Sequence, residues 1–427
     1  MNPATLLLSI FLALFLAHYA WERWLAVLNW RHSNRDHSGL PPMLREHVTP
    51  EAHERNLDYQ RQHTLFDHVE NTIAAILILV YLFSPFIPWL QSAINQFFPR
   101  KIHCDVLLIA SFTIITGFLQ VPLELYEIFI IEARFNFNRM TVGEFWLDKI
   151  KELVVFSVLG IPFLYILFGL ISSAGEWWWL WAALLTIGFE CSMMILYPVV
   201  IAPLFNEFTP LPDGELKTSL DNLIRECHFP AQGIYVMDGS SRSTHSNAYF
   251  AGFGGARRIV LYDTLIEQLD TTELTAILAH EIGHWRCSHI LKMLGISSLL
   301  TLAGFFLLWM TIHWPPLYQA FGYSKPDPAI GILLFGMLGG TFTFWLTPFL
   351  NRISRRNEYE ADAFAVKMTH NPSAMESALF KLYQNNLSNL TPHPWYSSYH
   401  YSHPTPLERM QSVRAASSLV VSRNEMR

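Results

Sequence analysis

Seven long apolar segments constrain this chain more than any other feature of its sequence. A helix that crosses a bilayer needs roughly 20 mostly apolar residues, because lipid cannot satisfy its backbone polar groups. The segments that meet this condition are 3–21, 71–92, 105–123, 154–174, 177–201, 290–312 and 328–350. Apolar residues make up 51% of the chain and charged residues only 15%, against about 25% charged in soluble proteins. The sequence therefore predicts an all-α, polytopic membrane protein embedded in a lipid bilayer.

The distribution of Lys and Arg between these segments predicts the orientation. Alternate loops and the C-terminal tail hold 25 of these residues, and the intervening loops hold 3. Loops rich in Lys and Arg remain in the cytoplasm, so we expect the N-terminus outside and the basic loops inside. The first segment has no basic residue before it and no small-residue cleavage site after it, so we expect a retained span rather than a signal peptide.

Two polar blocks, 202–289 and 351–427, are long enough to fold on the cytoplasmic side. The predicted organisation is spans one to five with cytoplasmic loops (1–201, loops 22–70 and 124–153), the first polar block (202–289), spans six and seven (290–350) and the second polar block (351–427). Within the first loop, 50–69 is predicted as an amphipathic helix against the membrane or the polar blocks. The net charge of −6 argues against nucleic-acid binding. The four cysteines are far apart and are predicted to be buried thiols.

The first polar block ends in a metal-binding pattern, T-E-L-T-A-I-L-A-H-E-I-G-H-W. His280 and His284 are four residues apart on a predicted helix, so both imidazoles project from one face and can bind a single Zn²⁺. Glu281 lies beside them, where it can take a proton from zinc-bound water. The pattern predicts a hydrolytic zinc site that still needs a third protein ligand.

A second helical pattern, S-R-R-N-E-Y-E-A-D-A-F-A, offers that ligand. Glu358 and Asp362 share a helical face, whereas Glu360 points away from it. Glu358 can bind the metal, and Asp362 can accept the free N–H of a ligating histidine. His289 follows His284 by five residues and is predicted on the wrong face. Two spans separate the half-sites, so both halves return to the same side of the membrane and can meet.

These motifs resemble the type I CAAX prenyl endopeptidases, the integral-membrane zinc proteases that process prenylated C-termini. The similarity extends over nearly the whole chain and includes H-E-I-G-H-W (280–285), S-R-R-N-E-Y-E-A-D-A-F-A (354–365), R-S-T-H-S-N-A-Y-F (242–250), R-I-V-L-Y-D-T-L (258–265), H-Y-S-H-P-T-P-L-E-R (400–409) and P-L-E-L-Y-E-I-F-I-I-E-A-R-F-N-F-N (122–138). A bacterial heat-shock protease shares the zinc motifs but has four spans.

The resemblance implies seven helices around a water-filled chamber, with a small α+β gluzincin-type zinc protease domain at the cytoplasmic end. It also implies one Zn²⁺ per chain, bound by His280, His284 and Glu358, with Glu281 as the general base. By the same resemblance, His403 stabilises the transition state and Arg409 supports the cluster. The substrate is implied to bind along an edge strand that contains Asn247, Ala248 and Tyr249.

The sequence supports part of this picture independently. The run N-A-Y-F-A-G-F-G-G-A-R-R-I-V-L-Y has two β-rich pieces around Gly252–Gly255 and predicts a hairpin, with Asn247 and Tyr249 on one side. An extended peptide can add to such an edge as a further strand. A carboxylate facing lipid is costly, so Glu190, inside the fifth segment, is predicted to face the chamber without an assigned role. Three other histidines are predicted to be structural: His245, His370 and His400.

We therefore predict a membrane zinc endopeptidase whose substrates are peptides, including prenylated CAAX-type C-termini. The alternatives are a quality-control protease of the heat-shock type, a transporter, and an inactive scaffold. A transporter does not need a hydrolytic centre, and the presence of Glu281 argues against an inactive scaffold. The tail carries no lysine-rich retrieval signal, which favours a bacterial inner membrane over the endoplasmic reticulum. Oligomeric state and native substrate are not predicted.

Overall fold

The computed structural model describes residues 1–34, 37–252 and 257–425. Within these residues, seven helical runs are long and apolar enough to cross a membrane, which confirms the predicted number. The helices that form these runs are α1 (Pro3–Ser33), α3 (Pro50–Phe83), α5 (Lys101–Tyr126) with the π-helix Glu127–Glu132, α6 (Val142–Val155) and α7 (Ile161–Ser173) joined by the π-helix Phe156–Gly160, α8 (Trp178–Leu196) with the π-helix Tyr197–Ile201 and α9 (Ala202–Phe205), α13 (His289–Ile312), and α15 (Pro328–Thr343) with α16 (Thr347–Thr369).

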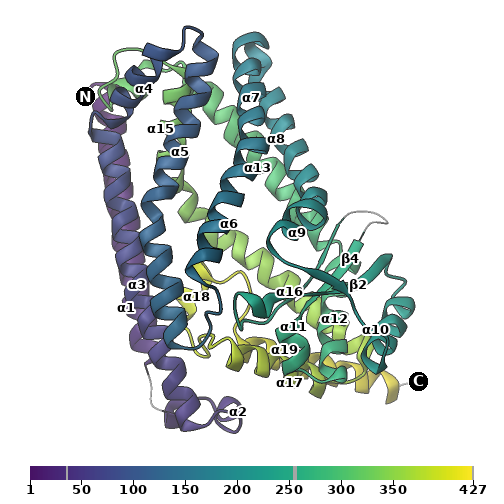
Figure 1. Cartoon of the computed structure of the whole chain (residues 1–427). Helices are drawn as coiled ribbons and strands as arrows, with labels where there is room; N and C mark the ends of the chain where they lie inside the picture. Colours follow the sequence, from purple (N-terminus) through teal and green to yellow (C-terminus); the bar gives the residue numbers. More distant parts are fainter. Residues whose placement is uncertain (35–36, 253–256, 426–427) are drawn as a thin grey trace.

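The spans form a closed ring. Helix α1 contacts α3 and α15, α5 contacts α7, α7 contacts α8, and α13 contacts both α8 and α15. Helix α5 also contacts α15, which closes the ring, and Thr116 of α5 donates a hydrogen bond to the hydroxyl of Tyr81 of α3 over 3.2 Å. Figure 1 shows the N-terminus and α4 (Phe86–Phe97) at one end of this ring and α2 (Pro42–Arg45) with the C-terminal helices at the other. The two chain ends therefore lie at opposite ends of the molecule, as an odd number of crossings requires.

Several spans extend further than their apolar segments predict. Residues 50–69, predicted as a separate amphipathic helix, are the first half of α3 and continue without a break into its apolar half. The second span ends at Phe83 instead of near 92, because Pro85 precedes a new helix, α4. The predicted loop 124–153 is also largely helical, since the helix from Lys101 runs to Glu132 and α6 begins at Val142. Hydropathy alone misplaces the polar ends because the helices continue beyond their apolar segments, whereas the early end at Phe83 is set by Pro85.

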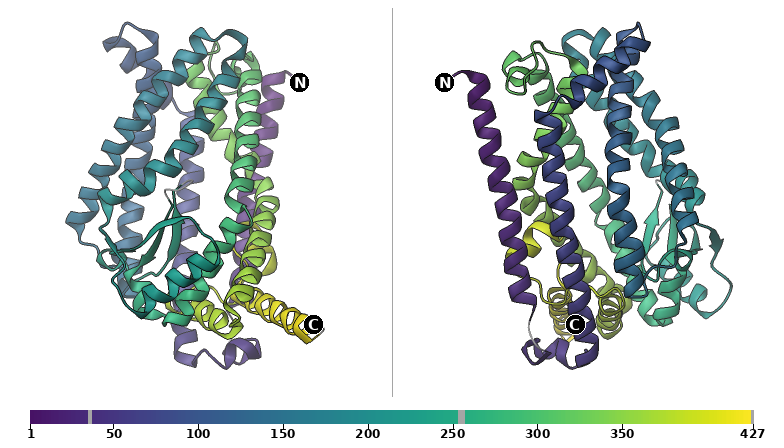
Figure 2. Two further views of the ribbon diagram at one scale, coloured as in Figure 1. Left: turned by 90° about the vertical axis from the view of Figure 1, so that its right-hand side faces the viewer. Right: turned by 60° about the vertical axis from the view of Figure 1, so that its left-hand side comes forward.

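A small α+β unit lies at the end of the ring that carries the C-terminus (Figures 1 and 2). Its sheet has the strand order β1-β2-β4-β3, with β2 and β4 parallel and the other pairs antiparallel. The strands are β1 (Phe208–Pro210), β2 (Ala231–Met237), β3 (Ala248–Ala251) and β4 (Arg257–Tyr262). The helices of this end are α10 (Glu215–Glu226), α11 (Asp263–Gln268), α12 (Thr271–Arg286), α17 (Pro372–Asn385), α18 (Pro394–His400) and α19 (Pro406–Glu425), and α14 (Pro315–Gln319) lies between spans six and seven.

One apolar core joins the two polar blocks. Buried residues of β2, β4, α10 and α12 from the first block pack against α16, α17 and α19 from the second. Glu273 of α12 is almost fully buried and accepts hydrogen bonds from Ser377 and Lys381 of α17. The two blocks are therefore joined by polar contacts as well as by the apolar core. The four cysteines are free, as predicted, although only Cys104 and Cys227 are fully buried. The two halves of the predicted site are therefore parts of one folded unit.

Candidate active site

Helix α12 positions the histidine pair. Its first turn is closed by a capping box, in which Asp270 accepts the backbone N–H of Glu273 and Glu273 accepts the N–H of Asp270. Such a reciprocal cap fixes where the helix begins. From that start, His280 and His284 project from one face, with Nε2 atoms 3.1 Å apart. The predicted i, i+4 arrangement is present.

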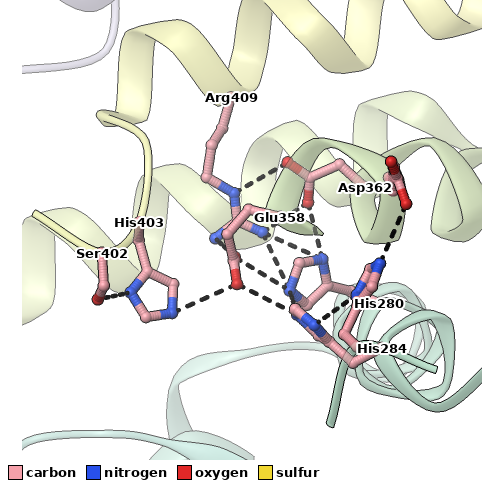
Figure 3. A network of polar contacts seen from close by, with 9 residues as sticks. His280, His284, Glu358, Asp362, Ser402, His403 and Arg409 are labelled. Carbon is pink, nitrogen blue, oxygen red and sulfur yellow. Dashed lines mark hydrogen bonds and ion pairs between the residues drawn. The ribbon is translucent and has the colours of Figure 1, made fainter. Parts of the chain in front are cut away.

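Helix α16 brings the acidic pattern against α12, and Gly283 allows the close approach. A Cβ atom at Gly283 would lie 3.1 Å from both the Cα and the carbonyl oxygen of Ala361. That spacing is tighter than ordinary van der Waals contact, so only glycine lets the two helices lie this close. As a result, Glu358, one turn before Ala361, faces the histidine pair (Figure 3).

The three predicted ligand residues converge on one point. Glu358 Oε2 lies 3.5 Å from His280 Nε2, and Glu358 Oε1 lies 3.2 Å from His284 Nε2. Zinc bonds of about 2.0–2.1 Å in a tetrahedral site separate neighbouring ligand atoms by about 3.3 Å. Glu358 Oε2 is also buried without a hydrogen-bond partner, an orphan that a cation would satisfy. The donor set and its spacing therefore fit a divalent metal such as zinc.

Asp362 and Arg409 support His280 on the Nδ1 side of its ring. Asp362 Oδ1 lies 2.8 Å from His280 Nδ1, and Arg409 Nε donates to Asp362 Oδ2 over 2.9 Å. Both side chains are buried, and Asp362 has no exposed surface. Burial disfavours the Arg409 charge, but the ion pair with Asp362 overrides it and raises the pKa of the guanidinium. Because Nε2 of His280 faces the other ligands, its Nδ1–H donates to Asp362, which fixes the ring.

His289 and Glu360 support His284, and this corrects the placement predicted for His289. His289 Nδ1 lies 3.1 Å from His284 Nδ1, and His289 Nε2 lies 3.2 Å from Glu360 Oε2. The argument from helical faces assumed one continuous helix. Instead α12 ends at Arg286, and Ser288 adopts a left-handed conformation (φ 57°) that turns His289 back toward His284. Glu360 points away from Glu358, as predicted, and thereby reaches His289.

Glu281 lines the same space as the ligand residues. It borders both cavities that flank the metal centre, and each cavity also includes His284 and Glu358. Burial raises the pKa of Glu281, while the neighbouring histidines oppose this effect. A carboxylate with a raised pKa beside a metal centre is suited to accept and return a proton.

Strand β3 is one of the two edge strands of the sheet, as predicted for the substrate strand, and it contacts α12. Asn247 and Ala248 line a cavity of about 560 Å³ that contains His403 and Arg409, whereas Tyr249 and Phe250 line a second cavity of about 580 Å³. Asn247 and Tyr249 were predicted on one side, but Asn247 precedes the strand and strict alternation does not apply to it. The predicted turn extends into residues 253–256, which lie outside the described residues.

His403 approaches the metal centre from the loop before α19 (Figure 3). Its Nε2 lies 3.5 Å from Glu358 Oε1, and its Nδ1 lies 3.0 Å from the Ser402 hydroxyl. Partial burial lowers the pKa of His403, which favours the neutral imidazole, and a neutral ring carries one N–H to donate. About 63% of the side chain is nonetheless exposed, on the side of the cavity. The geometry leaves its imidazole within reach of a bound peptide.

The remaining sequence candidates have structural partners or line a cavity. His245 lies 3.0 Å from Glu132 and stacks on Phe137, which connects the polar unit to the third span. His370 ends α16 in a left-handed conformation, and His400 lies 3.4 Å from Glu22 of α1. Glu190 lines the cavity that contains Tyr249, so it faces the interior as predicted. The sequence analysis did not predict the contact between His289 and His284. The only sequence signal for it is the Cys-Ser pair before His289, where the helix ends.

A His–His–Glu cluster in which His280 and Glu358 are buried, with an adjacent glutamate, lies at one end of a ring of membrane helices and defines a membrane-embedded metallopeptidase. Comparison with known proteins agrees: residues 29–207 match the family model "CAAX prenyl protease N-terminal, five membrane helices", and residues 210–417 match "Peptidase family M48". The chain belongs to peptidase family M48, with the N-terminal membrane region of the CAAX prenyl proteases.

Similar proteins cover nearly the whole chain. CAAX prenyl protease 1 from Saccharomyces cerevisiae is 34% identical, and 93% of each chain is covered. CAAX prenyl protease 1 homolog from Homo sapiens is 31% identical, also over 93% of each chain. The crystal structure of S. mikatae Ste24p superimposes with a TM-score of 0.86 at 32% identity and covers 97% of this chain and 99% of that one. The predicted family, fold class and metalloendopeptidase activity are confirmed.

Proposed function

We propose that this chain is a zinc endopeptidase that cleaves extended peptide segments close to the bilayer, with prenylated CAAX-type C-termini as its preferred substrate class. The observation that carries the proposal is the convergence of His280, His284 and Glu358 beside Glu281 and the edge strand of the sheet. In this proposal the first three residues bind one Zn²⁺ and Glu281 is the general base.

The surrounding residues supply the remaining steps of peptide hydrolysis. Bound zinc would polarise the scissile carbonyl and lower the pKa of water. Glu281 accepts the proton of the attacking water and returns it to the leaving amine. The neutral ring of His403 donates its N–H to the developing oxyanion. Asp362 and Arg409 keep His280 in place, while the backbone of Asn247, Ala248 and Tyr249 pairs with the substrate as an added strand.

The substrate class is supported by the position of the site and by the names of the similar proteins. Cavities on both sides of the metal centre give a peptide room to lie across it in an extended pose. The second cavity is bounded by the spans α8 and α13, which favours segments that are anchored in the membrane. The similar proteins carry the name CAAX prenyl protease 1, and we extend that specificity to this chain as a proposal.

The proposed active site faces the cytoplasm, because the basic loops and tail lie at its end of the ring. A reporter fused after residue 427 should behave as cytoplasmic and one inserted near residue 320 as external; the reverse pattern would contradict this orientation. The predicted bacterial inner membrane stays a prediction, and the similar proteins named above, which are eukaryotic, do not support it.

The test compares a farnesylated CAAX peptide with the same peptide lacking its lipid, using purified protein in detergent. Both should be cut, and the unlipidated peptide more slowly through weaker binding, because each buried CH₂ contributes about 0.8 kcal/mol. Glu281→Gln should keep the metal and lose hydrolysis, whereas His280→Ala, His284→Ala and Glu358→Ala should each lower zinc content. Near-normal turnover by Glu281→Gln would refute the assigned roles. Cleavage of a misfolded membrane protein but neither peptide would favour the quality-control alternative.

A further inference from the structure

The cavity of about 580 Å³ between the metal centre and the spans has an unusual composition. On one side it includes Glu281, His284 and Glu358, so whatever fills it lies next to the reacting bond. On the other side it is walled by α8 and α13. This cavity is therefore placed to hold a substrate side chain adjacent to the cleavage point.

Most of the wall formed by the spans is apolar. Ile290, Met293, Leu294 and Ser297 follow the i, i+3, i+4, i+7 spacing of one face of α13. Met194 contributes from α8. Methionine side chains are flexible and adapt to varied occupants, so this wall suits a long, flexible aliphatic chain.

Glu190 and Ser297 interrupt that apolar wall. The Ser297 hydroxyl donates to Glu190 Oε2 over 3.2 Å, and no hydrogen bond to Glu190 Oε1 is present among the described residues. Ser297 lies eight residues beyond His289, which corresponds to about 12 Å along the helix axis. The carboxylate therefore lies away from the metal, with the aliphatic wall in between.

The charges of the cavity favour a cationic occupant. No lysine or arginine lines it among the described residues. With Zn²⁺ bound, the charges of Glu281 and Glu358 are balanced by the ion, which leaves Glu190 as the uncompensated charge. A carboxylate within a membrane span is costly unless it is paired or solvated, and such residues commonly mark binding sites.

We propose that this cavity binds the side chain of a substrate lysine or arginine close to the cleaved bond. The aliphatic stem lies along Met194, Met293 and Leu294, and the cationic head is bound by Glu190 and by the lone pairs of the Ser297 hydroxyl. The inference rests on the proposed peptidase function and adds a charge preference to it, which selects substrates with a basic residue at one position near the scissile bond.

The experiment uses the purified full chain loaded with zinc and peptides of one parent sequence. Lysine, or the uncharged analogue norleucine, is placed in turn at each of three positions on either side of the cleaved bond. At one position we expect kcat/KM for lysine to exceed that for norleucine about tenfold or more, as for hydrogen bonds to charged groups. Glu190→Gln should bring this ratio close to one, and Glu190→Lys should reverse it.

Glu176→Gln is the matched control, because Glu176 is exposed at the far end of the same membrane run. It should keep the wild-type ratio. Zinc content is measured for every variant to show that the fold is intact. A lysine preference that persists in Glu190→Gln, or a wild-type enzyme without any such preference, overturns this inference alone. If the zinc-loaded wild type cuts none of the peptides, the proposed function fails and this inference with it.

Discussion

The two histidines of the metal centre are supported in different ways. His280 is buried and rests on Asp362 and Arg409, a carboxylate and a guanidinium with almost no exposed surface. His284 rests on His289, whose own partner, Glu360, is about one-third exposed and also contacts Arg356. The first support lies entirely in the protein core, whereas the second joins a buried histidine, His289, to a carboxylate that is partly exposed.

This difference teaches that equivalent contacts to a metal ligand need not have equivalent energies. A buried ion pair needs both of its charges, since removal of one leaves the other unpaired in a low-dielectric interior. An exposed carboxylate can be replaced by water at little cost. We therefore expect the Asp362 side to determine both stability and metal binding, and the Glu360 side to tune metal binding alone.

The largest expected effect is that of Asp362→Asn. The substitution leaves the Arg409 guanidinium buried without its closest carboxylate and weakens the orientation of His280. We expect the free energy of unfolding in detergent to fall by about 3 kcal/mol or more, and zinc affinity to fall about 10–100-fold. Reversible denaturation and competition with a chelator measure the two effects. An Asp362→Asn protein of unchanged stability would contradict the view of this side as core.

A smaller effect is expected from Gly283→Ala, which tests the contact between α12 and α16. This contact keeps both supports in place, because it sets the distance between the two helices. The added Cβ would meet the α16 backbone at Ala361, so the helices must separate by a few tenths of an ångström. Overpacking of this kind costs about 1–3 kcal/mol, and it moves Glu358 away from both histidines. Zinc affinity and the free energy of unfolding should both decrease.

Gly295→Ala is the matched control for this substitution, because a Cβ at Gly295 of α13 meets nothing within 4 Å. It should leave zinc affinity unchanged. Equal zinc affinity in Gly283→Ala and the wild type would show that the close approach of α12 and α16 is not needed for the site.

The smallest expected effect is that of Glu360→Gln. The amide oxygen can still accept a hydrogen bond from His289, so His289 keeps its place beside His284. The amide carries no charge, however, so this hydrogen bond is less polar than the original one. Zinc affinity should fall by about tenfold at most, and the free energy of unfolding should change by less than about 0.5 kcal/mol, as for other exposed charges. His289→Ala, measured by the same chelator competition, should be more severe. If Glu360→Gln matched Asp362→Asn, the two supports would be equivalent and the comparison would fail.

The apolar runs, the His–Glu–His spacing and the acidic helix were readable from the sequence because each depends on local periodicity. Hydrophobic length determines which segments can enter a bilayer, and a four-residue spacing places two side chains on one helical face in any context. For this reason the spans, the pair His280 and His284, and the shared face of Glu358 and Asp362 were predictable. The exact ends of the spans were less predictable, since α3 continues into the polar region, where hydropathy no longer marks a helix.

Only the tertiary structure decided how these local patterns are combined. The contact at Gly283 determines the distance between α12 and α16, the left-handed turn at Ser288 returns His289 to His284, and the ring of spans places Glu190 in a cavity that adjoins the metal centre. Each of these depends on contacts between residues far apart in sequence or on a single backbone angle at a helix end. Periodicity carries no information about either, because it describes the faces of one helix and not the distance to its neighbour.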